Sequence, residues 1–533
     1  MEDALLGKYA AIVGEAYALT SPEQLLPYET ATYETSTKVK AVLLPNSTEQ
    51  VQALIKLANE HLDPIYPISS GKNWGYGSAV PTADGCTILD LSRMTKIVKF
   101  DPDLAYVTLE PGVTQKQLYD FLQQQGGHMW MDATGSSQDC SIIGNTMERG
   151  FGHTPYGDHF GSVSGLELVL ANGERFKTGF GRFPQAQAAE VYHWGVGPYL
   201  DGLFSQSSFA VVTQMTVWLM PKPAYFQAFF CSVDKDDFGP MVDALRPLRL
   251  DGTLKSAMHL VNGDKVVSAF DQYPWQEMEG AAPLSREWLA QRLKQLDAKE
   301  WNASGALYGT WLEVAIARRK IKKALANIPS RNIKFLDDKL LKLARLVQKP
   351  YQMITGFDLK GALDKSIPVY LLKQGVPTNA FIPSTYWRKK TPPPEMDQAH
   401  PDRDRCGLLW LAPVAPMTGK HATRLEHLVY KYLLEYGFEP AISMTLLTER
   451  CIDCVICITY DRDNPEEEQQ ALACHDALFS ALTSEGYFPY RLSTRAMGML
   501  PAAAPAYIKV VNDIKRVLDP NLILSPGRYQ EKD

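Results

Sequence analysis

The stretch PISSGKNWGYGS, residues 67–78, follows a short apolar run and sets Gly71, Gly75 and Gly77 among small polar residues. Glycine adopts positive φ without strain, so such a loop can turn several backbone N–H groups toward one anion, for example a pyrophosphate. The stretch matches neither the GxGxxG dinucleotide fingerprint nor the GxxxxGK[ST] phosphate loop. Taken alone, it is equally typical of two tight turns.

Outward from this loop, residues 36–220 alternate short β-like runs with helical patterns and contain a second glycine-rich region, CSIIGNTMERGFGHTPYGD, at 140–158. Residues 226–485 change to longer helical patterns and strand-like runs, and the Pro- and charge-rich segment 388–406 is expected to be a long surface loop. A chain of 533 residues exceeds the ~250–300 residues of one hydrophobic core. The patterning therefore predicts an α+β protein of two domains or more.

The composition is that of a soluble globular protein, with 45% hydrophobic and 21% charged residues. A formal net charge of -6 gives no electrostatic reason to expect nucleic acid or an anionic membrane as partner. The densest basic run, ARRKIKKAL at 317–325, is typical of a solvated helix face. The N-terminus lacks a signal-peptide pattern, no run reaches the ~18 apolar residues of a membrane span, and the 8 cysteines are sparse. These features predict a cytoplasmic protein.

The glycine-rich regions belong to a longer series of segments. The series is PISSGKNWGYGSAVP (67–81), LDLSRM (89–94), AYVTLEPGVTQKQLYDFL (105–122), SIIGNTMERGFGHTPYGDHF (141–160), GLELVLANGE (165–174), GPYLDGLFSQSSFAVVTQMTVWLMPKP (197–223) and LDPNLILSPGRY (518–529). In this order the segments resemble the vanillyl-alcohol oxidase family of FAD enzymes. The resemblance implies an FAD-binding domain of residues 1–225, an α+β cap domain of residues 226–485 over the flavin, and a C-terminal return, 486–533, to the FAD domain.

The resemblance also implies which residues line the cofactor. Residues 69–75 would hold the pyrophosphate, the SIIGN segment would line the same cofactor, Val211 would meet the adenine through its backbone, and Arg528 would lie near the flavin. The implied set is Ser69, Ser70, Gly71, Lys72, Asn73, Trp74, Gly75, Ser141, Gly144, Asn145, Val211 and Arg528. The alternative for Arg528 is a surface charge on the tail.

Family members bind a phenol with two tyrosines and an arginine, which here match Tyr76, Tyr490 and Arg491. These groups lower the pKa of the phenol, so that the phenolate pushes charge through the ring while hydride passes to flavin N5 and a quinone methide forms. Asp158 matches the family's acid near N5. The implied function is oxidation of a para-substituted phenol or related aromatic alcohol by an oxidase or dehydrogenase. Without the resemblance, Tyr490 and Arg491 are a core tyrosine beside a surface arginine, and Asp158 is a turn cap.

Two further implications concern the cofactor bond and the partners. The histidine that carries covalent flavin in the family falls on Leu408, and no histidine precedes His61, so non-covalent FAD is expected. A thioether from Cys406 is the minor alternative to a buried free thiol. The partners expected are a small-molecule substrate and oxygen or another electron acceptor, with a homodimer as the implied assembly.

The run RCIDCVICITYDRD, residues 450–463, departs most from the family. Its cysteines at 451, 454 and 457 alternate between the two faces of a strand, so no metal site is predicted. Asp453 stands where relatives place a substrate-facing histidine. A carboxylate there disfavours a nearby phenolate but suits a base for a hydroxyl or an anchor for a cationic amine. The alternative function is therefore oxidation of a non-phenolic alcohol or amine in specialised-metabolite biosynthesis, with Asp453 as base or anchor.

Overall fold

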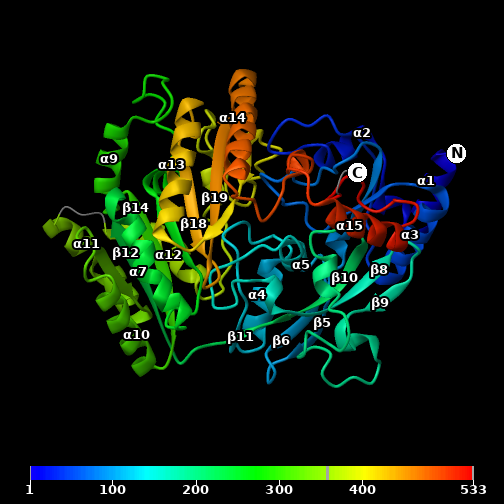
Figure 1. Cartoon of the computed structure of the whole chain (residues 1–533), viewed down its shortest axis with the longest axis horizontal. Coiled ribbons are helices and arrows are strands. Elements are labelled where there is room, and N and C mark those ends of the chain that lie inside the picture. Colours follow the sequence, from blue (N-terminus) through cyan, green and yellow to red (C-terminus); the bar gives the residue numbers. More distant parts are fainter. Residues whose placement is uncertain (1, 356–358, 531–533) are drawn as a thin grey trace.

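The computed structural model describes residues 2–355 and 359–530, which form two neighbouring parts (Figure 1). The first part contains three sheets, with strand orders β1-β2-β4-β3, β5-β6-β10-β8-β9 and β11-β7. The strands are β1 (Ala18–Leu19), β2 (Val39–Leu43), β3 (Ile65–Ile68), β4 (Cys86–Asp90), β5 (Ile97–Asp101), β6 (Tyr106–Leu109), β7 (Met129–Trp130), β8 (Val163–Leu170), β9 (Arg175–Lys177), β10 (Ala210–Trp218) and β11 (Met220–Pro221). The predicted alternation of strands and helices is confirmed in this part.

Helices cover these sheets where the sequence supplies an apolar stripe and a cap. The helices are α1 (Glu2–Val13), α2 (Pro22–Leu25), α3 (Thr48–His61), α4 (Gln115–Gln124), α5 (Ile142–Met147) and α6 (Asp201–Phe204). The hydroxyl of Ser47 caps α3 by accepting from the N–H of Gln50, and the helix buries Val51, Leu54 and Ile55. Helix α3 thus packs beside β3, the strand that leads into the glycine loop between β3 and β4.

The second part is built on an eight-stranded antiparallel sheet in the order β15-β12-β14-β13-β18-β19-β16, with β17 pairing β19. The strands are β12 (Tyr225–Val233), β13 (Met258–Asn262), β14 (Trp301–Gly309), β15 (Asn332–Leu336), β16 (Cys406–Leu411), β17 (Val414–Pro416), β18 (Ala441–Leu446) and β19 (Cys451–Asp461). The strands of the two groups of sheets thus divide between Pro221 and Tyr225, and the domain bounds given by the resemblance stay a prediction.

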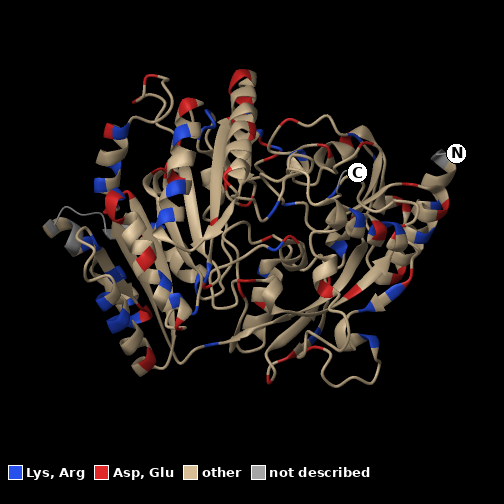
Figure 2. Cartoon of the chain, in the orientation of Figure 1, with Lys and Arg blue, Asp and Glu red and all other residues tan. Residues whose placement is uncertain are grey.

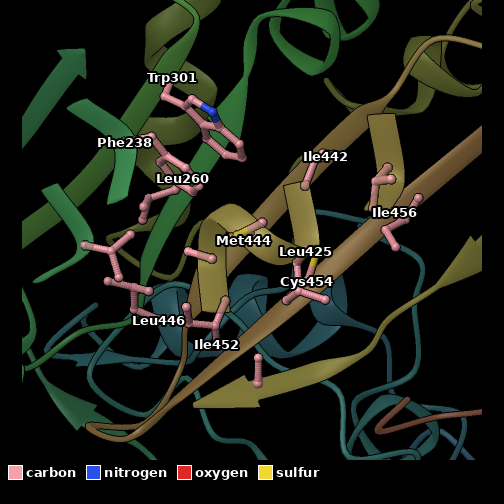
Figure 3. Packing of buried hydrophobic residues seen from close by; sticks show 14 of the residues in the cluster. Phe238, Leu260, Trp301, Leu425, Ile442, Met444, Leu446, Ile452, Cys454 and Ile456 are labelled. Carbon is pink, nitrogen blue, oxygen red and sulfur yellow. The ribbon is translucent and has the colours of Figure 1, made fainter. Parts of the chain in front are cut away.

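The two faces of the eight-stranded sheet have different neighbours. One face packs under α7 (Phe238–Leu250), α10 (Trp311–Ala324), α13 (Gly419–Glu435) and α14 (Pro465–Ser484). Its core holds Leu260, Met444 and Cys454, and the ring of Phe238 stacks on Trp301 with centroids 3.6 Å apart (Figure 3). Because successive strand residues point to opposite faces, the residues between these core positions face the other way.

The other face of the sheet carries α11 (Asp338–Thr355) and α12 (Leu359–Leu372), with α8 (Gly263–Phe270) and α9 (Arg286–Gln295) nearby. Leu341 of α11 and Leu363 of α12 pack on Phe226 and Ala228 of β12. These helices cover part of this face of the sheet. The rest of the face lies toward the first part of the molecule.

The C-terminal segment returns to the first part through α15 (Pro505–Leu518), so both chain ends lie on the same side of the molecule (Figure 1). Leu524 forms a parallel bridge with Ile65 at the edge of β3. The ammonium of Lys515 is buried and donates to Asp519 (2.7 Å), to the carbonyl of Ser208 (2.6 Å) and to the carbonyl of Leu524 (2.8 Å). A buried ion pair therefore fixes the tail.

The segment 388–406 corrects one expectation. It has no helix or strand before β16, but Arg388 and Lys389 are only 2% and 6% exposed, so the prediction of a surface loop is wrong there. Arg388 pairs with Glu439 (2.8 Å), and Lys389 pairs with Asp461 (2.9 Å). Opposite charges placed within hydrogen-bond distance let these two residues pack inside the protein. Residues 390–392, 395 and 397–398 are exposed, as expected of a surface loop.

The basic run 317–325 lies on α10 and its C-cap, and its Lys and Arg residues are exposed, as predicted. They appear as the blue segments of the helix at the lower left of Figure 2. Across the described ranges, none of the helices combines the length and apolarity needed to span a bilayer.

Candidate active site

A cavity of about 1320 Å³ lies between the first part and the second face of the eight-stranded sheet. Its walls include segments of residues 66–78, 134–153 and 204–212, together with Ser525 and Arg528 of the tail. Ordinary ligand pockets have ~300–1,000 Å³. The volume therefore suits a cofactor together with a substrate.

The loop that opens the sequence analysis has the backbone of an anion-binding loop. Gly71, Gly75 and Gly77 have φ values of 66°, 76° and 123°, a range that favours glycine. A Cβ on Gly75 would lie 1.8 Å from Cδ1 of Trp410 on β16. Glycine at this position is therefore required both for the turn and for contact between the two parts of the molecule.

The two glycine-rich regions lie side by side. A Cβ on Gly144 would lie 2.2 Å from Oγ of Ser69, and the N–H of Ser141 donates to Oγ of Ser70 (3.2 Å). Of the twelve residues expected at the cofactor, all line the cavity except Gly75. The residues that the sequence predicts at the cofactor therefore lie together in one wall of the cavity.

Four buried polar atoms of the cavity wall have no hydrogen-bond partner among the described residues: Trp74 Nε1, Ser78 Oγ, His153 Nδ1 and Arg491 Nε. Because buried polar groups are hydrogen-bonded as a rule, these atoms indicate a polar molecule in the cavity. Together with the glycine loop, they fit a polar cofactor such as FAD.

Arg528 enters the same wall from the tail. Its guanidinium donates to the hydroxyl of Tyr66 (2.5 Å) and forms an ion pair with Glu148, and its side chain is 17% exposed. The hydroxyl of Tyr529 also donates to Glu148 (2.9 Å). The interpretation of Arg528 as a surface charge is wrong, because these partners hold it against the cavity.

Tyr76, Tyr490 and Arg491 come together in the cavity wall. Cζ of Arg491 lies 4.3 Å from the centroid of the Tyr76 ring, and its guanidinium donates to the side chain of Asn73. The backbone of Tyr490 is fixed by Gln206, whose amide donates to the Tyr490 carbonyl (2.9 Å). Residues more than 400 apart in the chain thus form one cluster.

Both tyrosines of this cluster are neutral hydrogen-bonding groups. Burial raises the pKa of Tyr76, with the neighbouring Tyr490 as the next cause. Burial also raises the pKa of Tyr490, and the nearby Arg491 opposes this shift. A buried pair of neutral hydroxyls beside a guanidinium can donate to an anion, which is the chemistry required to bind a phenolate.

Asp453 lies on the cavity-side face of the sheet. It pairs with Thr445 in the register of β18 and β19, whereas the next residue, Cys454, belongs to the core. Burial raises the pKa of Asp453 to about 7, and the nearby carboxylate of Asp158 adds to the shift. Asp453 is not among the described residues that line the cavity, but its charge is close enough to raise the pKa of Tyr490.

Asp158 is exposed and accepts a hydrogen bond from the N–H of Gly161 (3.0 Å). This contact is the turn cap that the residue pattern alone suggests. Asp158 does not belong to the described cavity wall, so its role next to the flavin stays a prediction.

Two histidines in the wall were not singled out from the sequence. The rings of His153 and His259 stack with centroids 3.8 Å apart, and His259 contacts the Gly152 carbonyl (3.3 Å) and the Thr445 hydroxyl (3.1 Å). Burial lowers the pKa of both rings, that of His259 to about 3. Buried Lys373 lies close by, and burial lowers its pKa to about 7. In the sequence, the only signal for His259 is the alternation of apolar and other residues in MHLVN, 258–262, which places His259 on the strand face opposite the core.

The three cysteines of the run 450–463 do not line the cavity. Cys454 lies in the core on one face of β19 and Cys457 in an apolar cluster on the other, and the described residues contain no group of His, Cys, Asp and Glu suited to a metal. Leu408 lines the cavity, but Cys406 does not, and burial raises the pKa of its thiol. The burial of Cys406 outside the cavity wall favours a buried free thiol over a thioether, and non-covalent FAD stays a prediction.

Comparison with known proteins identifies the cofactor domain and full-length relatives. A family model described as an FAD binding domain matches residues 39–179. The chain is 42% identical over 529 residues to 1'-carboxy-chondrochloren decarboxylase of Chondromyces crocatus, covering 98% of this chain and 96% of that protein. It is 34% identical over 539 residues to the flavoprotein subunit of hydroxylating 4-cresol dehydrogenase of Pseudomonas putida, covering 98% of this chain and 94% of the subunit.

Solved structures share the whole architecture. Substrate-bound p-cresol methylhydroxylase matches with a TM-score of 0.87 and 31% identity, over 100% of this chain and 98% of that one. The isoeugenol complex of 4-ethylphenol oxidase from Gulosibacter chungangensis matches with a TM-score of 0.88 and 26% identity, over 99% of this chain and 97% of that one. The chain therefore belongs to the vanillyl-alcohol oxidase family and is an FAD-dependent oxidoreductase of the p-cresol methylhydroxylase type.

Proposed function

We propose that this enzyme oxidises a para-substituted phenol, or a related aromatic alcohol, by removing a hydride from the carbon attached para to the hydroxyl. The observation that carries the proposal is the buried cluster of Tyr76, Tyr490 and Arg491 in the cavity wall. Asp158 and Asp453 are the further residues proposed to act during catalysis.

The cluster explains how a phenol becomes reactive at neutral pH. Tyr490 and Tyr76 donate hydrogen bonds to the phenolate oxygen, and Arg491 supplies the positive charge that lowers the phenol's pKa. Bound FAD supplies the hydride acceptor. The phenolate then stabilises the cation left on the substrate as a quinone methide, and the low-polarity cavity strengthens each of these contacts.

Asp453 is compatible with this chemistry when it carries a proton. Its pKa of about 7 leaves the group neutral at mildly acidic pH, which removes the like-charge repulsion expected against a phenolate. The same pKa favours the second candidate, oxidation of a non-phenolic alcohol or amine with Asp453 as base or anchor, because a general base works best near the ambient pH.

Anaerobic mixing of the FAD-loaded enzyme with 4-ethylphenol or 4-ethylanisole distinguishes the two candidates. We expect the phenol alone to bleach the flavin, since the methyl ether cannot form a phenolate. Tyr490→Phe is expected to slow bleaching about 10- to 100-fold, because a hydrogen bond to a charged group contributes ~1.5–3 kcal/mol. Tyr487→Phe is the matched control, as its hydroxyl bonds to His421 (2.9 Å) away from the cavity. Bleaching by a non-phenolic alcohol or amine but by neither ethyl compound would assign the second candidate.

One further arm of the assay concerns carbon dioxide. The relative at 42% identity is named a decarboxylase, so 3-(4-hydroxyphenyl)propanoate is included and CO₂ is measured. Release of CO₂ in step with flavin bleaching would assign an oxidative decarboxylation to this chain. The electron acceptor, proposed to be oxygen or another oxidant, follows from the reoxidation rate in air, and the homodimer and the cytoplasmic location stay predictions.

A further inference from the structure

Helix α11 has two apolar faces, of which only one packs on the protein. The inner face lies on the sheet through Leu341 and includes Ala344, which lines the cavity. A second apolar row, the outer row, recurs at spacings of three, four and seven residues, which places it along one side of the helix. The outer row consists of Leu343, Leu346, Val347, Met353 and Ile354, all exposed.

The outer row lies largely in solvent. Leu346, Met353 and Ile354 are 79%, 81% and 84% exposed. Leaving such side chains in water is unfavourable, and contiguous apolar patches on a protein surface usually mark a place of interaction. The outer row therefore indicates a contact surface for an apolar partner.

The side of α11 between its two apolar faces is basic. Lys342, Arg345 and Lys349 are exposed there, because their spacing of three and four residues sets them along one edge of the outer row. The two acids at the N-terminal end of the helix, Asp337 and Asp338, each accept a hydrogen bond of 2.6 Å from a tyrosine hydroxyl. The outer row is thus flanked by cations.

The basic character extends beyond α11. Residues 311–349 contain eleven Lys and Arg but three Asp and Glu, in a chain with a formal net charge of -6. Arg318 and Lys322 of α10 lie 4.7 and 5.7 Å from the ring centroid of Phe335, on the strand β15 that precedes α11. Figure 2 shows Lys and Arg residues on both helices at the left end of the molecule. The net charge of the chain therefore conceals a basic surface.

We infer that the outer row of α11 docks on an anionic lipid membrane. An apolar face flanked by Lys and Arg is typical of helices that lie in the membrane interface, with apolar side chains among the lipids and cations at the phosphates. A second copy of the chain fits this surface less well. A symmetric contact would bring Lys342, Arg345 and Lys349 close to the same three cations of the other copy.

Docking in this orientation places the membrane beside one end of the cavity. Leu340 of α11 lines the cavity and is 46% exposed, so the cavity reaches the surface next to this helix. The contact with lipid is therefore close to a route into the active site.

Co-sedimentation of the FAD-loaded enzyme with vesicles tests the docking. The probes are vesicles of phosphatidylcholine alone and vesicles that also contain phosphatidylglycerol. We expect the enzyme to sediment with the anionic vesicles only. Binding should fall when the salt concentration is raised from about 0.1 M to about 1 M, because the Debye length shortens from ~10 Å to ~3 Å. The measurement needs no turnover, so its result does not depend on the substrate proposed above.

Two variants of α11 distinguish the apolar contribution from the charged one. Leu346→Glu places a carboxylate in the outer row and is expected to weaken binding about tenfold or more. The double variant Lys342→Glu, Lys349→Glu should weaken binding by about 30-fold or more, since each basic residue near an anionic surface contributes roughly fivefold. The control is Lys420→Glu, Lys431→Glu, which changes the net charge equally at two exposed positions of α13 and should bind as the wild type does.

All of these substitutions fall on exposed side chains, so an unchanged Tm and an unchanged ratio of flavin to protein show that each variant is folded. Equal binding to both kinds of vesicle, binding to neither, or equal losses in the two double variants would overturn the inference. A dimer that forms without lipid and dissociates in Leu346→Glu would also overturn it, because a second copy would then cover the outer row.

Discussion

Asp453 combines a conspicuous place in the sequence with an unusual electrostatic environment. Its side chain is 4% exposed, and burial together with Asp158 raises its pKa to about 7. In the unfolded chain an aspartate has a pKa of ~3.9. The folded protein therefore binds a proton at this residue between about pH 4 and pH 7 that the unfolded chain has already lost.

Stability should consequently fall as pH rises through that window, since the folded state must give up the proton. Asp453→Asn removes the titration, and we expect its Tm to rise relative to the wild type between pH 5 and pH 8. The difference is about 4 kcal/mol at most, because one pKa unit corresponds to ~1.4 kcal/mol. Thermal melts followed by flavin fluorescence measure it, with exposed Asp103→Asn as control. An equal pH trend in wild type and Asp453→Asn would exclude this assignment.

At the scale of elements, the glycine loop packs directly against strand β16. Gly75 and Gly85 have similar positive φ values, 76° and 72°. A Cβ on Gly75 would clash with Trp410, whereas a Cβ on Gly85 would meet nothing within 4 Å. Comparing substitutions at Gly75 and Gly85 therefore distinguishes the cost of backbone strain from the cost of a steric clash.

We therefore expect Gly85→Ala to cost about 1 kcal/mol through strain alone. Gly75→Ala should cost more and should also lower the ratio of bound FAD to protein, because the loop must move away from the cofactor. The flavin absorbance per protein and the Tm check both effects. Equal losses in the two variants would mean that the contact with Trp410 does not position the loop.

The elements also show which parts of the site could be predicted from the sequence and which could not. The glycine motifs and the resemblance at Tyr76 and Tyr490 pointed to residues that line the cavity, because short-range motifs carry their own backbone geometry, and their contacts with FAD stay predictions. His153, His259 and Lys373 were missed, since their positions depend on strand register and on pairing between distant segments. The buried ion pairs of Arg388 were missed for the same reason, as composition alone marks such a segment as exposed.

At the scale of the whole molecule, the tail completes the cavity. Lys515 of α15 and its C-cap residue Asp519 form a buried i,i+4 pair, and Lys509 and Asp513 form an exposed pair within the same helix. Asp519 also accepts the N–H groups of the segment that leads to Arg528. Fixing the tail is therefore inseparable from lining the flavin site.

Lys515→Met should destabilise the enzyme by about 3–5 kcal/mol, because it leaves the Asp519 carboxylate buried without its partner. Lys509→Met should change stability by less than about 1 kcal/mol, as expected for an exposed pair. Thermal unfolding and retention of FAD on gel filtration provide the measurements. Retained FAD and an unchanged Tm in Lys515→Met would show that the tail is held by other contacts.

The eight-stranded sheet has one face in the core and one face along the cavity, so the same strands carry two separable sets of positions. Substitutions at Ser232, Ser304, Val261 and Ser443 alter the cavity, while their neighbours Val233, Leu260 and Met444 preserve the core. A directed-evolution library restricted to the first set can therefore explore new substrates at little loss of foldable variants. Substrate specificity can therefore change through the cavity-side residues while the core residues of the same strands keep the fold unchanged.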